Sequence, residues 1–136
     1  MYPEYLVAPM REELTKVGFK ELKSAPEVDA ALQSGGTALV VVNSVCGCAA
    51  ANARPGVRMA VNHAKKPQHL LTVFAGMEKD AVDQARAHML PFPPSSPAIA
   101  LFKDGKLVHM IERHQIEGRS ADLIADNLTA AFDQYC

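Results

Sequence analysis

Apolar residues follow two different periods along this chain, and the periods divide it into helices and strands. Apolar positions recur at helical spacing in four segments, residues 3–17, 25–34, 78–89 and 120–135. Short apolar runs that predict strands occupy residues 19–22, 37–43, 69–75, 98–102 and 106–111. The predicted order is therefore helix and strand in alternation, with a hairpin of two strands before the last helix.

The residues between these segments explain where each one ends. Ser24 begins a capping box with Glu27, and Ser120 suits the N-cap of the last helix. Asp104-Gly105 is a strong hairpin signal, and the proline-rich stretch 91–97 predicts an irregular loop. Strand–helix–strand units imply parallel pairing, whereas the hairpin adds an antiparallel edge. We expect one α/β domain over residues 1–136, with a mixed central sheet flanked by helices.

Composition and charge exclude several classes of protein. The chain has 136 residues, of which 49% are hydrophobic, and a net charge of −1, which argues against a nucleic-acid partner. No apolar run approaches the ~20 residues of a membrane span. The start, Met1-Tyr2-Pro3-Glu4, lacks the pattern of a signal peptide. We therefore expect a cytoplasmic protein with no membrane partner, whose thiols are kept reduced.

Cys46-Gly47-Cys48 is the strongest chemical signal in the sequence. It follows the apolar run 39–42 and precedes an alanine-rich stretch, residues 49–54, that predicts a helix. A strand-to-helix junction favours a thiolate, because free N–H groups and the helix dipole stabilise negative charge. Since the thiolate is the form that attacks disulfides, we expect thiol–disulfide exchange, with Cys46 as nucleophile and Cys48 as the more buried resolving thiol.

The single residue between the cysteines predicts an unusual geometry. On a regular helix, residues two apart point roughly 200° apart, so a Cys46–Cys48 bond would distort the backbone and oxidise other thiols readily. Gly47 tolerates unusual dihedral angles and leaves room for a substrate. The helix after the cysteines is expected to reach about Lys65, with a kink at Pro55-Gly56.

Other interpretations of these residues remain open. The cysteines could be small core residues without chemistry, in a domain that only binds partners, or two ligands of a soft metal. A closed zinc site needs four ligands, and the histidines show no ligand spacing, so we expect no metal. Cys136 is expected to be an exposed free thiol at the terminus.

Polar residues near the cysteines also allow two interpretations. Asn43 and Ser44 either position the thiols or satisfy the end of the strand. Arg54 and Arg58 either hold an anionic thiol or, as the pattern favours, form a solvated helix face.

The predicted order of elements is similar to the thioredoxin fold with an extra N-terminal helix, a three-layer arrangement. Pro55 interrupts the helix after the cysteines, and the run Ser96-Pro97-Ala98-Ile99-Ala100-Leu101-Phe102 followed by Lys103-Asp104-Gly105 resembles the segment in which a cis-proline precedes the hairpin. The resemblance implies that Pro97 is cis and faces the cysteines, and that Ser96 and Pro97 contact the substrate. Thioredoxins, however, carry two residues between their cysteines.

The stretch from Val40 to Ala50, with Asn43-Ser44-Val45 directly before the cysteines, resembles the bacilliredoxin family, as does Val7-Ala8-Pro9-Met10-Arg11-Glu12-Glu13-Leu14. This resemblance implies removal of bacillithiol from mixed disulfides on cytosolic proteins, together with disulfide isomerase activity. It implies no bound cofactor, bacillithiol as the thiol co-substrate and S-thiolated client proteins as partners. We expect a monomer or weak homodimer.

Overall fold

Five strands form one mixed sheet in the computed structural model, which describes residues 1–136. In spatial order the strands are β1 (Lys20–Glu21), β3 (His69–Phe74), β2 (Thr37–Asn43), β4 (Ala98–Lys103) and β5 (Lys106–Ile111). β3 pairs in parallel with β1 and β2, whereas β4 pairs antiparallel with β2 and β5. The predicted combination of parallel units with an antiparallel hairpin at the edge is confirmed.

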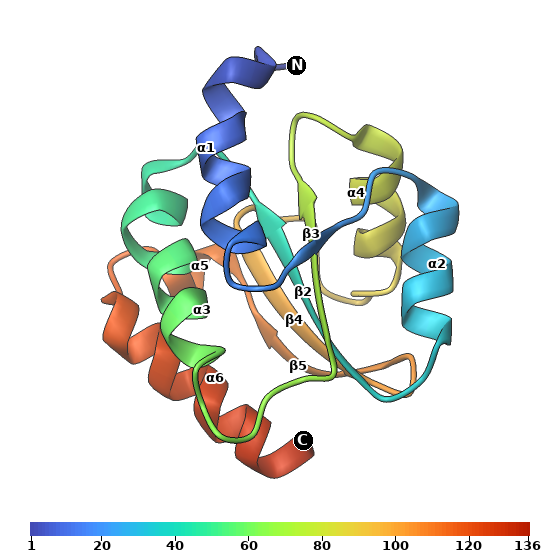
Figure 1. Cartoon of the computed structure of the whole chain (residues 1–136), viewed down its shortest axis with the longest axis vertical. Helices are drawn as coiled ribbons and strands as arrows, with labels where there is room; N and C mark the ends of the chain where they lie inside the picture. The colour runs from blue at the N-terminus through green and yellow to red at the C-terminus, as the bar shows by residue number, and fades with distance from the viewer.

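Helices cover both faces of this sheet, and Figure 1 shows the three layers. The α-helices are α1 (Glu4–Thr15), α2 (Ala25–Gln33), α3 (Arg54–Ala60), α4 (Lys79–Ala87), α5 (Arg113–Ile116) and α6 (Ala121–Tyr135). α1, α3 and α6 lie on one face, and α2 and α4 on the other. Ser24 and Ser120 cap α2 and α6 as predicted. None of the helices has the length and hydropathy needed to cross a membrane.

The central strand β2 is buried along its whole length, because it contributes side chains to both hydrophobic cores. Leu39 and Val41 pack beneath α3 and α6, whereas Val40 and Val42 pack beneath α2 and α4. This double burial explains why residues 37–43 read as a continuous apolar run. It also fixes the carboxyl end of β2, from which the cysteine turn leaves the sheet.

The predicted helix from the cysteines to Lys65 is wrong in two respects. After Gly47 and Cys48, which are α-helical, it contains one π-helical turn, η1 (Ala49–Ala53), and its α-helical part ends at Ala60. The Arg54 N–H donates to the Ala49 carbonyl, five residues back, directly before Pro55, which has no N–H to donate. The proline was therefore correctly expected to perturb the helix, but the perturbation is a π turn.

The short helix α5 was not predicted, because four residues are too few to show a hydrophobic period. The Glu112 side chain accepts from the backbone at Gln115, and the Gln115 side chain accepts from the Glu112 N–H. Asn52 Nδ2 on η1 donates to the Ile116 carbonyl oxygen (3.1 Å). This bond ties α5 to the helix that follows the cysteines.

Gly56 allows α3 to lie directly against α6. A Cβ at this position would lie 2.8 Å from Ile124 Cγ2 and 3.0 Å from the Ala121 carbonyl oxygen. Real Cβ atoms do not approach so closely, so any larger residue forces the two helices apart.

We expect Gly56→Ala to lower the free energy of unfolding by about 1–3 kcal/mol, because overpacking outweighs the better helix propensity of alanine. Urea denaturation followed by circular dichroism measures this change. Gly47→Ala is the matched control, since a Cβ there meets nothing within 4 Å. Equal stability of the two variants would show that the α3–α6 contact is not tight.

Candidate active site

The cysteine turn begins where β2 ends, and its backbone is held by the side chains of the residues just before it. The Ser44 N–H donates to Asn43 Oδ1 (2.9 Å), and the Cys46 N–H donates to Ser44 Oγ (3.0 Å). The Cys46 carbonyl oxygen then accepts the N–H groups of Ala49 and Ala50. Cys46 therefore lies at the start of the helix, as predicted, and Asn43 and Ser44 position it.

The Arg54 side chain holds this turn in place through hydrogen bonds. Its Nη1 donates to Asn43 Oδ1 (3.0 Å) and to the Ser44 carbonyl oxygen (2.8 Å), while its Nε donates to Glu13 Oε2 (3.0 Å) on α1. Arg54 is only 2% exposed, so its prediction as part of a solvated helix face is wrong. The sequence pattern could not show this, because the three partners come from α1 and the end of β2.

The sulfur atoms of Cys46 and Cys48 face each other at a distance of 2.6 Å, and both side chains are half-buried. Cys48 packs against the core beneath α3 and α6. The expected divergence of the two side chains assumed a regular helix over both residues. Cys46 instead lies just before the helical residues, which begin at Gly47, so that assumption does not apply to Cys46. The strain of a Cys46–Cys48 bond stays a prediction.

The two thiols have opposite ionisation tendencies. The pKa of Cys46 is lowered, chiefly by the hydrogen bond from the Cys48 side chain and further by the backbone N–H groups of Cys48 and Ala49 and the charge of Arg113. The pKa of Cys48 is raised, first by burial and then by its hydrogen bond to Cys46 and the charge of that sulfur. Cys46 is thus the more readily ionised thiol of the pair, and Cys48 keeps its proton to a higher pH.

Arg113, at the start of α5, is a site residue that sequence reasoning missed. Its Nη1 donates to the Ser96 carbonyl oxygen (3.2 Å), and its backbone N–H donates to Ser95 Oγ (3.3 Å). Its side chain also pairs with Glu117. No local pattern links Arg113 to Cys46, because the sheet topology alone brings them together.

A pocket of about 370 Å³ opens beside Cys46. It is lined by residues from the N-terminus, the cysteine turn, the end of β3, α4, the proline-rich loop and α5: Tyr2, Ser44, Val45, Cys46, Ala75, Gly76, Arg86, Ser96 and Arg113. The predicted substrate residue Ser96 therefore lies in the same pocket as Cys46, the predicted nucleophile. Pro97 is buried and does not line it, so its contact with substrate stays a prediction.

The Ser96–Pro97 peptide bond is cis, as predicted, and Leu90–Pro91 is a second cis bond that was not foreseen. Gly47 does not have a positive φ angle, so its expected unusual dihedral angles are not found. It is exposed, and a Cβ there would meet nothing within 4 Å. The space around Gly47 is open, which leaves the approach to Cys46 free.

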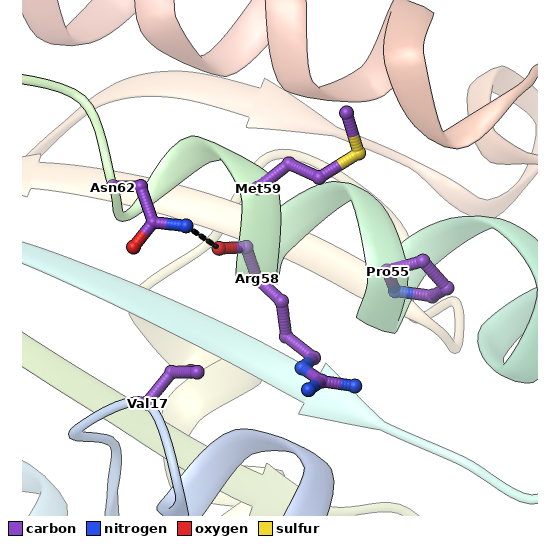
Figure 2. Close-up of a pocket in the computed structure, with 5 residues that line it drawn as sticks. All are labelled: Val17, Pro55, Arg58, Met59 and Asn62. Atoms are coloured by element: carbon purple, nitrogen blue, oxygen red, sulfur yellow. Dashed lines mark hydrogen bonds between the residues drawn. The ribbon is translucent and has the colours of Figure 1, made fainter.

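Arg58 and Cys136 lie away from this pocket. Arg58 extends from α3 into a different pocket, which it shares with Val17, Pro55, Met59 and Asn62 (Figure 2). Cys136 is exposed, but partial desolvation of its thiol raises its pKa, whereas Thr37 and nearby lysines oppose that shift. Thr37 begins β2 and the cysteine turn follows its end, so Cys136 lies about 20 Å from Cys46 at the opposite end of the sheet.

No group of three or more His, Cys, Asp or Glu side chains is arranged to hold a metal ion. The soft-metal interpretation of Cys46 and Cys48 therefore has no third protein ligand within the chain. The geometry instead supplies the parts that thiol–disulfide exchange requires: an activated thiolate, a neighbouring thiol and an open approach.

Comparisons with known proteins agree with this chemistry. The family described as Disulphide isomerase matches residues 2–136. A bacilliredoxin of Cytophaga hutchinsonii is 60% identical and covers 98% of this chain and 99% of its own length. A bacilliredoxin of Staphylococcus epidermidis is 49% identical over 100% of this chain and 94% of its own.

Solved structures show the same fold at low sequence identity. Fasciola hepatica thioredoxin, 15% identical, superimposes with a TM-score of 0.60 over 87% of this chain and 100% of its own. A structure described as a putative oxidoreductase with a thioredoxin fold, 18% identical, also gives a TM-score of 0.60, over 78% of this chain and 91% of its own. The chain thus belongs to the bacilliredoxin family and is a thiol–disulfide oxidoreductase with a thioredoxin fold.

Proposed function

We propose that this protein removes bacillithiol from mixed disulfides on cytosolic client proteins, with Cys46 as nucleophile and Cys48 as resolving thiol. The observation that carries the proposal is the contact between the two sulfurs, in which the Cys46 pKa is lowered and the Cys48 pKa is raised. The names of the relatives support bacillithiol as the small thiol.

In the first step, the Cys46 thiolate attacks the bacillithiol sulfur of the client mixed disulfide. The bond between the client and bacillithiol breaks, a bond between Cys46 and bacillithiol forms, and the client leaves as a thiolate that takes up a proton. The open space around Gly47 lets a protein-sized substrate approach, and Ser96 lines the pocket beside Cys46.

In the second step, Cys48 loses its proton and attacks Cys46 Sγ. Bacillithiol leaves as a thiolate, and a Cys46–Cys48 disulfide forms. An external thiol reductant then supplies the two electrons that restore both thiols. Cys48 is suited to this later role because its higher pKa keeps it a thiol until Cys46 has reacted.

Disulfide isomerisation is a second candidate function for the same pair. The description of the matching family, Disulphide isomerase, favours it. The chemistry is the same first attack on a wrong disulfide of a client, followed by attack of another client thiol on the mixed disulfide. The activities differ in the intermediate, which joins Cys46 to bacillithiol in the first and to the client in the second, and in whether Cys48 or a client thiol resolves it.

We expect Cys48→Ser to accumulate an adduct between Cys46 and bacillithiol, because the first exchange proceeds and the second has no attacking sulfur. Cys46→Ser is expected to release no bacillithiol from the client. Both variants are made with Cys136→Ser, so that the exposed terminal thiol forms no adducts. Mass spectrometry of protein and client after mixing with a bacillithiolated client measures both results.

A glutathionylated copy of the same client is the control for the identity of the small thiol. Faster transfer from the bacillithiolated client supports the proposal, and equal rates would reduce it to general removal of small thiols. Release of bacillithiol by Cys46→Ser at the parent rate would show that Cys46 is not the nucleophile.

The ionisation of Cys46 is expected to depend on the hydrogen bond from residue 48, since that bond is the main cause of the lowered pKa. Cys48→Ser keeps a donor there and Cys48→Ala removes it. The alkylation rate of Cys46 should rise with pH through a midpoint below the ~8.5 of a free cysteine in Cys48→Ser, and through a higher midpoint in Cys48→Ala.

Iodoacetamide labelling between pH 5 and pH 10, read by mass spectrometry with Cys136→Ser in both proteins, gives the two midpoints. Identical midpoints would mean that the neighbouring side chain does not stabilise the thiolate. The helix N-terminus and Arg113 would then account for the shift.

A further inference from the structure

The pocket beside Cys46 contains two arginines and no acidic side chain among its lining residues. Arg113 lies at the start of α5 and Arg86 lies on α4, so the two charges reach the pocket from different elements. Tyr2 forms another wall, where its ring lies against Gly76, whose φ is +87°. Any molecule bonded to Cys46 Sγ and lying in this pocket meets two guanidinium groups.

Arg86 differs from the other buried or half-buried arginines in having no carboxylate partner. Arg11 contacts Glu4, Glu21 and Glu78, and Arg54 contacts Glu13. Arg86 Nη2 contacts the Ser95 carbonyl oxygen at 3.5 Å, and its Nε is buried without any hydrogen-bond partner.

The acid that lines a pocket together with Arg86 forms no ion pair with it. Asp83 lines the adjacent pocket together with Arg86, but its carboxylate is bonded to Lys79 (2.5 Å). A half-buried guanidinium that lacks both a counter-ion and a partner for Nε lowers the stability of the folded protein unless a ligand supplies them.

We propose that Arg86, together with Arg113, binds the carboxylate of a small thiol as that thiol is transferred to Cys46, and so makes the protein selective for anionic thiols. This inference rests on the proposed function and names the residues that select its small-thiol substrate. A guanidinium fork matches a carboxylate with two parallel hydrogen bonds, which lysine cannot reproduce.

The transfer itself needs no additional reactant. The Cys46 thiolate attacks one sulfur of a small symmetric disulfide, a new disulfide to Cys46 forms, and the other half leaves as a thiolate. One disulfide bond is exchanged for another, so the electrons balance. The carboxylate of the half retained on Cys46 is the group that the arginines bind.

Three small disulfides of similar length and different charge test this selectivity: 3,3′-dithiodipropionate is anionic, 2-hydroxyethyl disulfide is neutral and cystamine is cationic. The rate at which each forms an adduct on Cys46 is measured by mass spectrometry. The parent protein carries Cys48→Ser and Cys136→Ser, so that adducts on Cys46 persist. Comparing each variant with this parent cancels the intrinsic reactivity of the three disulfides.

Arg86→Gln is the informative variant, because Arg86 is not among the groups that shift the pKa of Cys46. We expect it to lower the ratio of the anionic to the neutral rate by about tenfold, as loss of a charge-assisted hydrogen bond would. The ratio of the cationic to the neutral rate should rise. Arg58→Gln, in the pocket of Figure 2, is the matched control and should keep both parent ratios.

The outcomes separate this inference from the proposed function. Adducts that form with unchanged ratios in Arg86→Gln, or with all three rates lowered equally, would overturn the selectivity, since Arg86 would then have only a structural role. No adduct on Cys46 of the parent with any disulfide would overturn the proposed function and this inference with it.

Discussion

The buried guanidinium of Arg54 holds the turn on which the site is built. It joins the end of β2, through Asn43 and the Ser44 carbonyl, to Glu13 on α1. A buried charge that loses its partner lowers the free energy of unfolding by about 3–5 kcal/mol. The bonds of Arg54 are therefore expected to form together when the protein folds. The Cys46 N–H can then reach Ser44 Oγ, and its carbonyl oxygen can accept the first N–H groups of the helix.

With the turn fixed, the two cysteines have different surroundings. Cys46 faces solvent, a pocket and the charge of Arg113, whereas Cys48 packs on the core and donates its hydrogen bond to Cys46. The pocket is completed by α4 and α5, whose residues lie far from the cysteines in sequence. The local motif therefore supplies the main causes of the lowered Cys46 pKa, and the sheet topology adds the charge of Arg113 and the other residues that line the pocket.

The predictions from the sequence were right for features that neighbouring residues determine. They were wrong or missing for features that depend on residues far apart in the chain. The buried run of β2, the cap at Ser24 and the place of Cys46 at a helix start all follow from adjacent residues. The burial of Arg54 was missed because its partners belong to α1 and β2. Arg86 and Arg113 were missed because no spacing in the sequence reports which side chains meet across a sheet. The π turn was missed because Pro55 predicts a perturbation and not its form.

The most direct test measures the pKa of Cys46 in Arg54→Lys by NMR of cysteine labelled with ¹³C at Cβ. Lysine keeps the charge but not the two separate donors, Nη1 and Nε, through which Arg54 joins Asn43 and Ser44 to Glu13. Arg11→Lys is the control, since Arg11 is also buried among carboxylates but lies outside the turn. We predict a higher Cys46 pKa in Arg54→Lys and an unchanged one in Arg11→Lys, with both proteins less stable. A folded Arg54→Lys protein with the parent Cys46 pKa would contradict the account.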